Sequence, residues 1–256
     1  PLLDRTKRLK LVQTGAGFDN VMIEECTKRG IYVAHGKGIN ARAVAEHVMG
    51  FILCWYKNLI YLDGMMKRGE YGVDYIGSEL SGKVVGIVGL GNIGKEVARL
   101  ANAFRMKVLG YPIRSIDMDT EIEFIDFTTL LKSSDIITLH LPLNDRTRQM
   151  IGRRELELMK KDALLINTSR GLIIDEAALI KALESKKIAG AALDVFETEP
   201  LPKDSPLRKL SNVILTPHTA GAPEGLRFHK NRYEFFIENI RRITSGKPPM
   251  NALNQI

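Results

Sequence analysis

The sequence predicts an α/β fold, in which a doubly wound parallel sheet is joined to a second, smaller α/β domain. Strand-like segments rich in Val, Ile and Leu alternate with helical segments from residue 83 to 216, which is typical of parallel sheets. A glycine-rich turn joins the strand at 84–88 to the helical pattern behind it. A separate strand–helix–strand pattern occupies residues 1–40 and indicates the smaller domain.

The first 68 residues contain the first expected elements. Strands are expected at 9–12 and 31–34, on either side of a helix at 21–29. The segment from 41 to about 68 is expected to be helical, and it is apolar nearly all round at 48–56. A helix of that kind is buried from several sides, as it would be between two domains.

The remaining elements alternate in type along the chain. The expected strands are 84–88, 107–111, 122–125, 135–140, 163–167, 190–194 and 213–216. The expected helices are 93–104, 127–132, 153–160, 175–186 and a last amphipathic helix at 228–244. Because the carboxyl ends of parallel strands meet at one edge of a sheet, we expect ligands to bind at that edge.

The turn after strand 84–88 has the spacing of a dinucleotide-binding loop. Gly89 permits the tight turn, Gly91 lets a pyrophosphate approach the backbone, and Gly94 lets the helix pack closely on the strand. The helix N-terminus supplies free N–H groups and the positive end of the helix dipole. A merely structural glycine turn is the alternative, and the strand before and helix after the motif disfavour it.

Further motifs follow in a recognisable order: GAGFDN at 15–20, VAEH at 44–47, HLPL at 140–143, NTSRG at 167–171, LDVFETEP at 193–200 and TPHTAG at 216–221. With these motifs and its glycine turn, the chain resembles the D-isomer-specific 2-hydroxyacid dehydrogenases. The resemblance implies a Rossmann-type dinucleotide-binding domain at 46–222 and a flavodoxin-like substrate domain formed by 1–45 and 223–256. Family members carry a further α/β segment before strand 9–12, so the substrate domain is expected to be incomplete at its N-terminus or unusually small.

The chemistry of 2-oxo acid reduction fits residues at the expected strand ends. The reaction needs a hydride donor, a cation for the carboxylate and an acid for the developing alkoxide. His218 suits the acid because histidine titrates near neutrality, and Glu199 would orient its ring and favour the protonated form. Arg170 offers a planar fork for a carboxylate. The resemblance implies the same three roles.

The resemblance also implies contacts with substrate and cofactor. Backbone N–H groups of Ala16 and Gly17 would receive the substrate carboxylate, with Asn40 as a further substrate contact. Asp194 would hold the nicotinamide carboxamide. The complete set of expected cofactor contacts is Gly89, Gly91, Asn92, Ile93, Gly94, Arg114, His140, Pro142, Thr147, Thr168, Asp194, His218 and Ala220.

The end of strand 107–111 bears on the choice between NAD and NADP. NAD-binding proteins usually place Asp or Glu there to hold the ribose hydroxyls, but Pro112 and Arg114 follow this strand. We predict that NADP is favoured, because no carboxylate repels a 2′-phosphate and Arg114 could contact it. Alternatively, Arg114 faces solvent and backbone groups hold NAD.

Two of the other four histidines have an expected role. His47 is expected to be structural because it lies on the helix between the domains, and His140 is expected to frame the cofactor pocket through its backbone. His35 and His229 remain unassigned. Formate oxidation is not expected, since formate dehydrogenases carry Gln where this chain has Glu199.

Composition narrows the function class. The net charge is +7, but Lys and Arg are scattered singly and in pairs, so nucleic acid is not an expected partner. The longest apolar run, 48–56, is far shorter than the ~20 residues that span a bilayer, and no membrane partner or metal site is expected. Cys26 and Cys54 show no disulfide framework, which suits a cytoplasmic protein. A homodimer through the dinucleotide domain is expected.

The function that these features predict is reduction of a small 2-oxo acid such as glyoxylate or hydroxypyruvate, or oxidation of the matching D-2-hydroxy acid. A dinucleotide-sensing protein that resembles the C-terminal-binding corepressors is the alternative, because such proteins keep the same triad. An inactive structural paralogue is disfavoured by the presence of Arg170, Glu199 and His218.

Overall fold

The computed structural model describes residues 2–72, 77–111, 121–222 and 226–256. The chain divides into two compact units, one formed by residues 1–40 and 222–256 and the other by residues 41–221. Helix α3 (Ala41–Tyr56) begins the larger unit and runs without a break across residue 46, where the motifs suggested a domain boundary. In the described residues, no helix is both long and apolar enough to cross a membrane.

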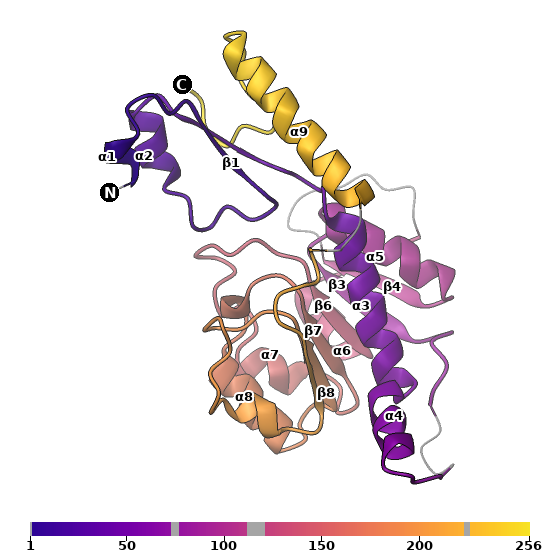
Figure 1. Cartoon of the computed structure of the whole chain (residues 1–256). Coiled ribbons are helices and arrows are strands. Elements are labelled where there is room, and N and C mark those ends of the chain that lie inside the picture. Colours follow the sequence, from indigo (N-terminus) through magenta and orange to yellow (C-terminus); the bar gives the residue numbers. More distant parts are fainter. Residues whose placement is uncertain (1, 73–76, 112–120, 223–225) are drawn as a thin grey trace. The chain divides into compact units, whose positions relative to one another are not determined.

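The larger unit contains one parallel sheet with the strand order β5-β4-β3-β6-β7-β8-β9 (Figure 1). Its strands are β3 (Val84–Val88), β4 (Lys107–Tyr111), β5 (Glu123–Phe124), β6 (Ile136–Leu139), β7 (Leu164–Asn167), β8 (Gly190–Leu193) and β9 (Val213–Leu215). Its other helices are α4 (Leu59–Lys67), α5 (Asn92–Ala103), α6 (Phe127–Ser133), α7 (Arg153–Leu158) and α8 (Glu176–Glu184), with 3-10 turns η1 (Gly171–Ile173) and η2 (Pro206–Lys209). The predicted doubly wound parallel sheet is confirmed.

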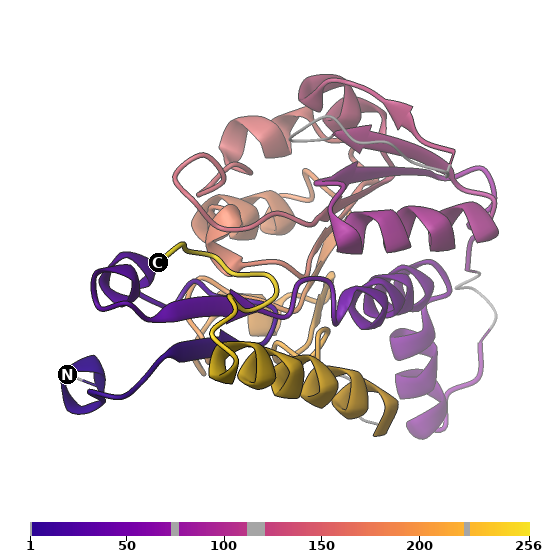
Figure 2. The same cartoon turned by 90° about the horizontal axis from the view of Figure 1, so that it is seen from above.

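Helices cover both faces of this sheet (Figures 1 and 2). Successive strand residues point to opposite faces, so Val85 and Ile87 pack with α3 and α5, while Val88 packs with α6, α7 and α8. The central strands β6, β7 and β8 are fully buried, which explains their nearly continuous apolar sequences.

The strand order creates a point where the direction of winding reverses. From β3, the sheet continues on one side to β4 and on the other side to β6. In open α/β sheets, ligands bind outside the carboxyl ends of the strands at such a point. The residues that follow β3, β6, β7, β8 and β9 therefore share one functional edge.

The smaller unit is a parallel pair, β1 (Leu11–Thr14) and β2 (Tyr32–His35), with helices α1 (Leu2–Arg5), α2 (Ile23–Lys28) and α9 (Leu226–Thr244). The C-terminal segment returns to this pair. Leu253 donates its backbone N–H to Val33 O at 2.7 Å, and Asn254 accepts a bond from the Val33 N–H, also at 2.7 Å. Asn239 of α9 donates its side-chain amide to Gln13 at 2.6 Å, so β1 is also tied to the last helix.

The helical stretch expected from 41 to about 68 is present but is divided in two. The structure has two helices, α3 and α4, that are interrupted at Lys57 and Asn58. Asn58 has a φ of 51°, in the left-handed region that cannot continue a right-handed helix. Both segments have helical sequence patterns, so their apolar periodicity does not reveal the break.

Candidate active site

The three motif glycines between β3 and α5 have different surroundings. Gly89 has a φ of 98°, and a Cβ atom there would collide with the His140 carbonyl oxygen. A Cβ atom on Gly94 would collide with the carbonyl oxygen of Gly89. Gly91, in contrast, is exposed, and an added Cβ atom would meet no other atom within 4 Å. Two of the glycines are therefore required by packing, and the third leaves open space before the helix.

This open space suits a dinucleotide phosphate. Gly91 is the N-cap of α5 and supplies no side chain to the N–H groups of the first helical turn. Asn92, which begins the helix, is exposed. Unpaired N–H groups at a helix N-terminus favour an anion. The described residues at this turn therefore fit the cofactor class that the glycine motif predicts.

Buried polar atoms lie unpaired at the same edge of the sheet. Thr168 follows β7, and its hydroxyl is buried without a hydrogen-bond partner among the described residues. The same holds for Nδ1 of His140, which follows β6, although His140 as a whole residue is partly exposed. A buried polar atom without a partner is costly in a folded protein. A bound ligand with polar groups would give such atoms partners.

His140 is held as a neutral imidazole. Its Nε2 atom lies 2.9 Å from the Thr138 hydroxyl. Burial lowers the pKa of His140 to about 3, because the charged ring would lose its hydration. This ring cannot serve as a proton donor near neutral pH. Its backbone carbonyl packs against Gly89, consistent with the framing role expected for it.

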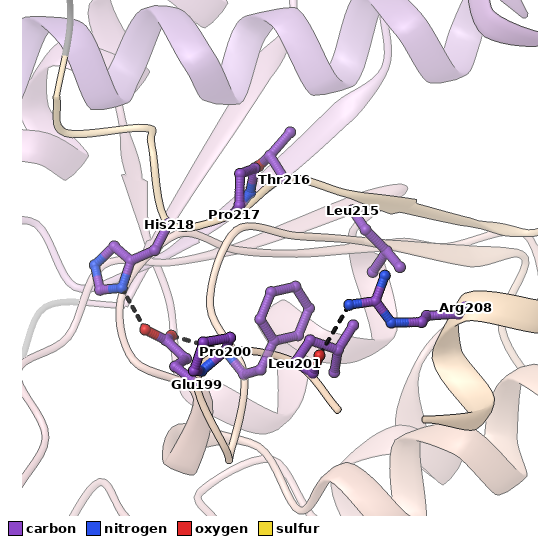
Figure 3. Close-up of a pocket in the computed structure, with 9 residues that line it drawn as sticks. Glu199, Pro200, Leu201, Arg208, Leu215, Thr216, Pro217 and His218 are labelled. Atoms are coloured by element: carbon purple, nitrogen blue, oxygen red, sulfur yellow. Dashed lines mark hydrogen bonds and ion pairs between the residues drawn. The ribbon is translucent and has the colours of Figure 1, made fainter. Parts of the chain in front are cut away.

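His218 and Glu199 form an imidazole–carboxylate pair (Figure 3). Nδ1 of His218 lies 2.7 Å from Oε2 of Glu199, and Oε1 of Glu199 accepts the Phe196 N–H at 3.1 Å. The His218 side chain is 49% exposed, and no described residue bonds its Nε2 atom. Both carboxylate oxygens are engaged. Glu199 therefore holds the Nδ1 edge of the ring, while Nε2 stays available to a ligand.

A cavity of about 560 Å³ adjoins this pair. Its lining is mostly apolar, with Phe196, Leu201, Leu215 and Pro217 beside the polar groups of His218, Glu199 and Arg208 (Figure 3). Arg208 is held by two backbone carbonyls, donating to Pro202 O at 2.9 Å and to Leu201 O at 2.8 Å. Arg170 is not among the residues that line this cavity.

Arg170 lies on a turn shaped by Asn167. The Asn167 side chain accepts the Ser169 N–H at 3.0 Å and donates to Arg170 O at 2.9 Å, which closes the turn after β7. Nη1 of Arg170 donates to Ser169 O at 2.7 Å. The next residue, Gly171, touches the Phe196 backbone so closely that a Cβ atom could not fit. The turn with Arg170 therefore packs directly on the loop that leads to Glu199.

Asp194 has contacts that the motifs did not reveal. It is 1% exposed, and its carboxylate accepts bonds from the Thr216 hydroxyl at 2.5 Å and from the N–H groups of Thr219 and Ala220 at 2.9 Å each. Nε2 of His47 lies 3.1 Å from the Thr216 hydroxyl. The carboxylate thus ties together the loop that carries His218. Neither Thr216 nor His47 was predicted as a site residue, although both lie inside the quoted motifs.

Among the described residues, several other predicted site residues form no hydrogen bond with this network. Thr147 is buried and donates its hydroxyl to Pro142 O at 2.6 Å, which fixes the loop after β6. Arg114 lies outside the described residues. Ala16, Gly17 and Asn40 belong to the smaller compact unit. Among the described residues, no cluster of three or more His, Cys, Asp or Glu could hold a metal ion.

Comparisons with known proteins identify the family. The family model described as "D-isomer specific 2-hydroxyacid dehydrogenase, NAD binding domain" matches residues 49–220. A glyoxylate reductase of Thermofilum pendens is 41% identical over 264 residues, which cover 99% of this chain and 77% of that protein. The resemblance that was read from the motifs is therefore confirmed.

Solved structures agree with the sequence relatives. The D-lactate dehydrogenase of Aquifex aeolicus, complexed with NAD and lactic acid, superposes with a TM-score of 0.89 at 32% identity, covering 100% of this chain and 83% of that one. An acyclic imino acid reductase in complex with NADPH and D-Arg gives a TM-score of 0.88 at 37% identity, covering 96% and 79%. The chain belongs to the D-isomer-specific 2-hydroxyacid dehydrogenase family and is a nicotinamide-dependent oxidoreductase of that family.

Proposed function

We propose that this protein reduces a small 2-oxo acid, with glyoxylate and hydroxypyruvate as the first candidates, to the corresponding D-2-hydroxy acid. The observation that carries the proposal is the pair formed by His218 and Glu199, with Nδ1 bonded and Nε2 left to a ligand. The glyoxylate reductase of Thermofilum pendens supports this substrate class by its 41% identity.

His218 is the proposed acid. Its Nε2–H would donate a proton to the carbonyl oxygen of the substrate as negative charge develops there. The bound nicotinamide cofactor would supply the hydride to the carbonyl carbon. Glu199 would orient the ring through Nδ1, which lies 2.7 Å from its Oε2 atom, and so leave Nε2 for the substrate.

Arg170 is the proposed carboxylate-binding residue. It stands on the turn after β7, which packs through Gly171 on the loop of Glu199. A guanidinium can bind a carboxylate with two parallel hydrogen bonds, which would orient the 2-oxo acid as well as hold it. Backbone N–H groups of Ala16 and Gly17, and the side chain of Asn40, are proposed as further substrate contacts.

The cofactor is proposed to be held by the glycine turn and the adjoining strand ends. The N–H groups at the start of α5 would bind the pyrophosphate, with Gly91 leaving room for it. Thr168 and His140 supply buried atoms that lack partners, and Asp194 would contribute its remaining acceptor capacity to the nicotinamide amide. NADPH is the proposed preference, on the basis of Arg114 in the sequence.

An absorbance assay tests this proposal. NADPH and NADH would each be combined with glyoxylate, hydroxypyruvate, pyruvate and a phosphorylated 2-oxo acid, using the full natural chain. We expect turnover on at least one of these acids and its loss in His218→Ala. Cofactor binding without turnover on any of them would reject the proposal and favour a dinucleotide-sensing protein instead.

A further inference from the structure

A chain of hydrogen bonds runs from helix α3 to the loop that carries His218. Nε2 of His47 lies 3.1 Å from the Thr216 hydroxyl, and that hydroxyl donates to Oδ1 of Asp194 at 2.5 Å. All three residues belong to the larger unit, yet His47 and Thr216 are 169 positions apart in the sequence. Helix α3 therefore contacts the site through one polar side chain.

The number of available protons determines the direction of this chain. A threonine hydroxyl has one proton, and here Thr216 gives it to Asp194. The Thr216 oxygen can only accept from His47, so Nε2 of His47 must carry a proton. His47 is thus a donor through Nε2.

Asp194, at the end of this series of hydrogen bonds, fixes the backbone around His218. Oδ1 of Asp194 also accepts the Thr219 N–H, and Oδ2 accepts the Ala220 N–H. The N–H of His218 itself donates to Asp194 O at 2.8 Å. His218 has a φ of 55°, a left-handed conformation that persists only where neighbouring bonds impose it. The bonds to Asp194 on both sides of this residue impose it here.

The ring of His47 is itself fixed in place. It packs edge-on against Phe51, one helical turn further along α3, with ring centroids 4.5 Å apart. Phe51 is buried, and the His47 side chain is only 24% exposed. Its Nε2–H is therefore aimed at Thr216 before any ligand binds.

We propose that His47 is a positioning residue for the catalytic histidine. By donating to Thr216, it keeps the Thr216 hydroxyl turned towards Asp194, and Asp194 then holds the strained loop that aims His218. This inference rests on the proposed role of His218 as the acid. It assigns to His47 a task in the reaction, where the sequence alone predicted a structural residue.

Four variants test the proposal. His47→Phe keeps the ring against Phe51 but removes the donor, whereas His47→Gln places an amide N–H where Nε2 stands. Thr216→Val removes the middle of the chain. Arg42→Gln is the control on the same helix, because its exposed side chain pairs with Glu46 on that helix.

The expected kinetic result is a loss in kcat with little change in KM. His47→Phe should lower kcat by about tenfold, the effect of roughly one hydrogen bond, while His47→Gln should restore most of the rate. The double variant His47→Phe/Thr216→Val should be no slower than Thr216→Val alone, because both act through one chain. Full activity in His47→Phe, or equal losses in the Phe and Gln variants, would overturn the proposal. Additive losses in the double variant would do the same.

Amide hydrogen exchange gives a measurement that does not depend on turnover. In His47→Phe, the N–H groups of Thr219 and Ala220 should exchange about tenfold faster than in the unsubstituted protein, while those of β6 stay unchanged. Unchanged exchange at Thr219 and Ala220 would refute the positioning role. If the unsubstituted protein turns over no 2-oxo acid, the proposed function fails, and this exchange result still decides whether His47 holds the loop.

Discussion

Nδ1 of His218 lies 2.7 Å from Oε2 of Glu199, and the other Glu199 oxygen accepts the Phe196 N–H. The Phe196 N–H therefore fixes the carboxylate independently of the imidazole. This arrangement determines which ring nitrogen carries a permanent hydrogen bond and which one faces a ligand. The first prediction follows from it.

Replacing Glu199 by Gln should lower kcat/KM for 2-oxo acid reduction by about tenfold or more. The amide has one oxygen where the carboxylate has two, so it cannot accept from the Phe196 N–H and hold Nδ1 of His218 in the same way. The measurement is kcat/KM for the variant and for the unsubstituted protein. An unchanged kcat/KM would contradict the orienting role of Glu199.

Substitutions at two of the motif glycines should have different effects, one on cofactor binding and the other on stability. Gly91→Ala should leave the free energy of unfolding within about 0.5 kcal/mol, because the added methyl meets only open space. It should weaken dinucleotide binding by about tenfold, since the methyl would crowd the phosphates. Gly94→Ala should lower the free energy of unfolding by about 2 kcal/mol, because its Cβ atom collides with the Gly89 carbonyl. Fluorescence titration and denaturant unfolding of both variants check these values. Unchanged dinucleotide affinity in Gly91→Ala would count against phosphate binding at this turn.

Replacing Arg114 by Ala should weaken the binding of NADPH much more than the binding of NADH. A guanidinium can pair with the 2′-phosphate that only NADPH carries, and no acidic residue follows β4 directly in the sequence to repel it. Dissociation constants for both cofactors give the measurement, with Arg146→Ala as an exposed control from the same domain. Equal losses for the two cofactors would reject the proposed NADPH preference.

His140 should make the protein less stable in acid. Its pKa is about 3 in the folded protein and 6.5 for an ordinary histidine, so between these values only the unfolded chain takes up the proton. The free energy of unfolding should therefore fall as the pH decreases from 6.5 towards 3, by about 1.4 kcal/mol for each pH unit at most. Denaturant unfolding over this range measures the slope. His140→Gln should show a smaller slope, and a slope equal to that of the unsubstituted protein would exclude His140 as the cause.

The proposed homodimer can be tested at α4. Leu59, Ile60, Tyr61 and Met66 are large apolar side chains that stand exposed on this one short helix. Clustered apolar exposure is typical of an interaction surface. We expect light scattering to give the mass of a dimer for the unsubstituted protein and a shift towards monomer for Ile60→Glu. A monomer at all concentrations would refute the proposal, and Lys67→Glu serves as the charged control on the same helix.

Local sequence patterns determined most of the fold. Strands β3 and β4 have the predicted bounds, 84–88 and 107–111, because each is a short and mostly apolar run. The glycine spacing likewise indicated the turn before α5, since Gly89 and Gly94 each meet a local requirement for conformation or close approach. Motifs of that kind are contiguous in the chain and can be read without coordinates.

Tertiary structure decided what depends on residues that are distant in the sequence. The break at Asn58 follows from a left-handed residue inside two helical patterns, which periodicity does not register. The separation of 2.7 Å between His218 and Glu199 exists only because two loops meet at the edge of the sheet. The bond from His47 to Thr216 joins α3 to the segment after β9, across 169 positions. The sequence by itself indicated the types of residue in the site. The packing of the strands and helices determined which of those residues come into contact.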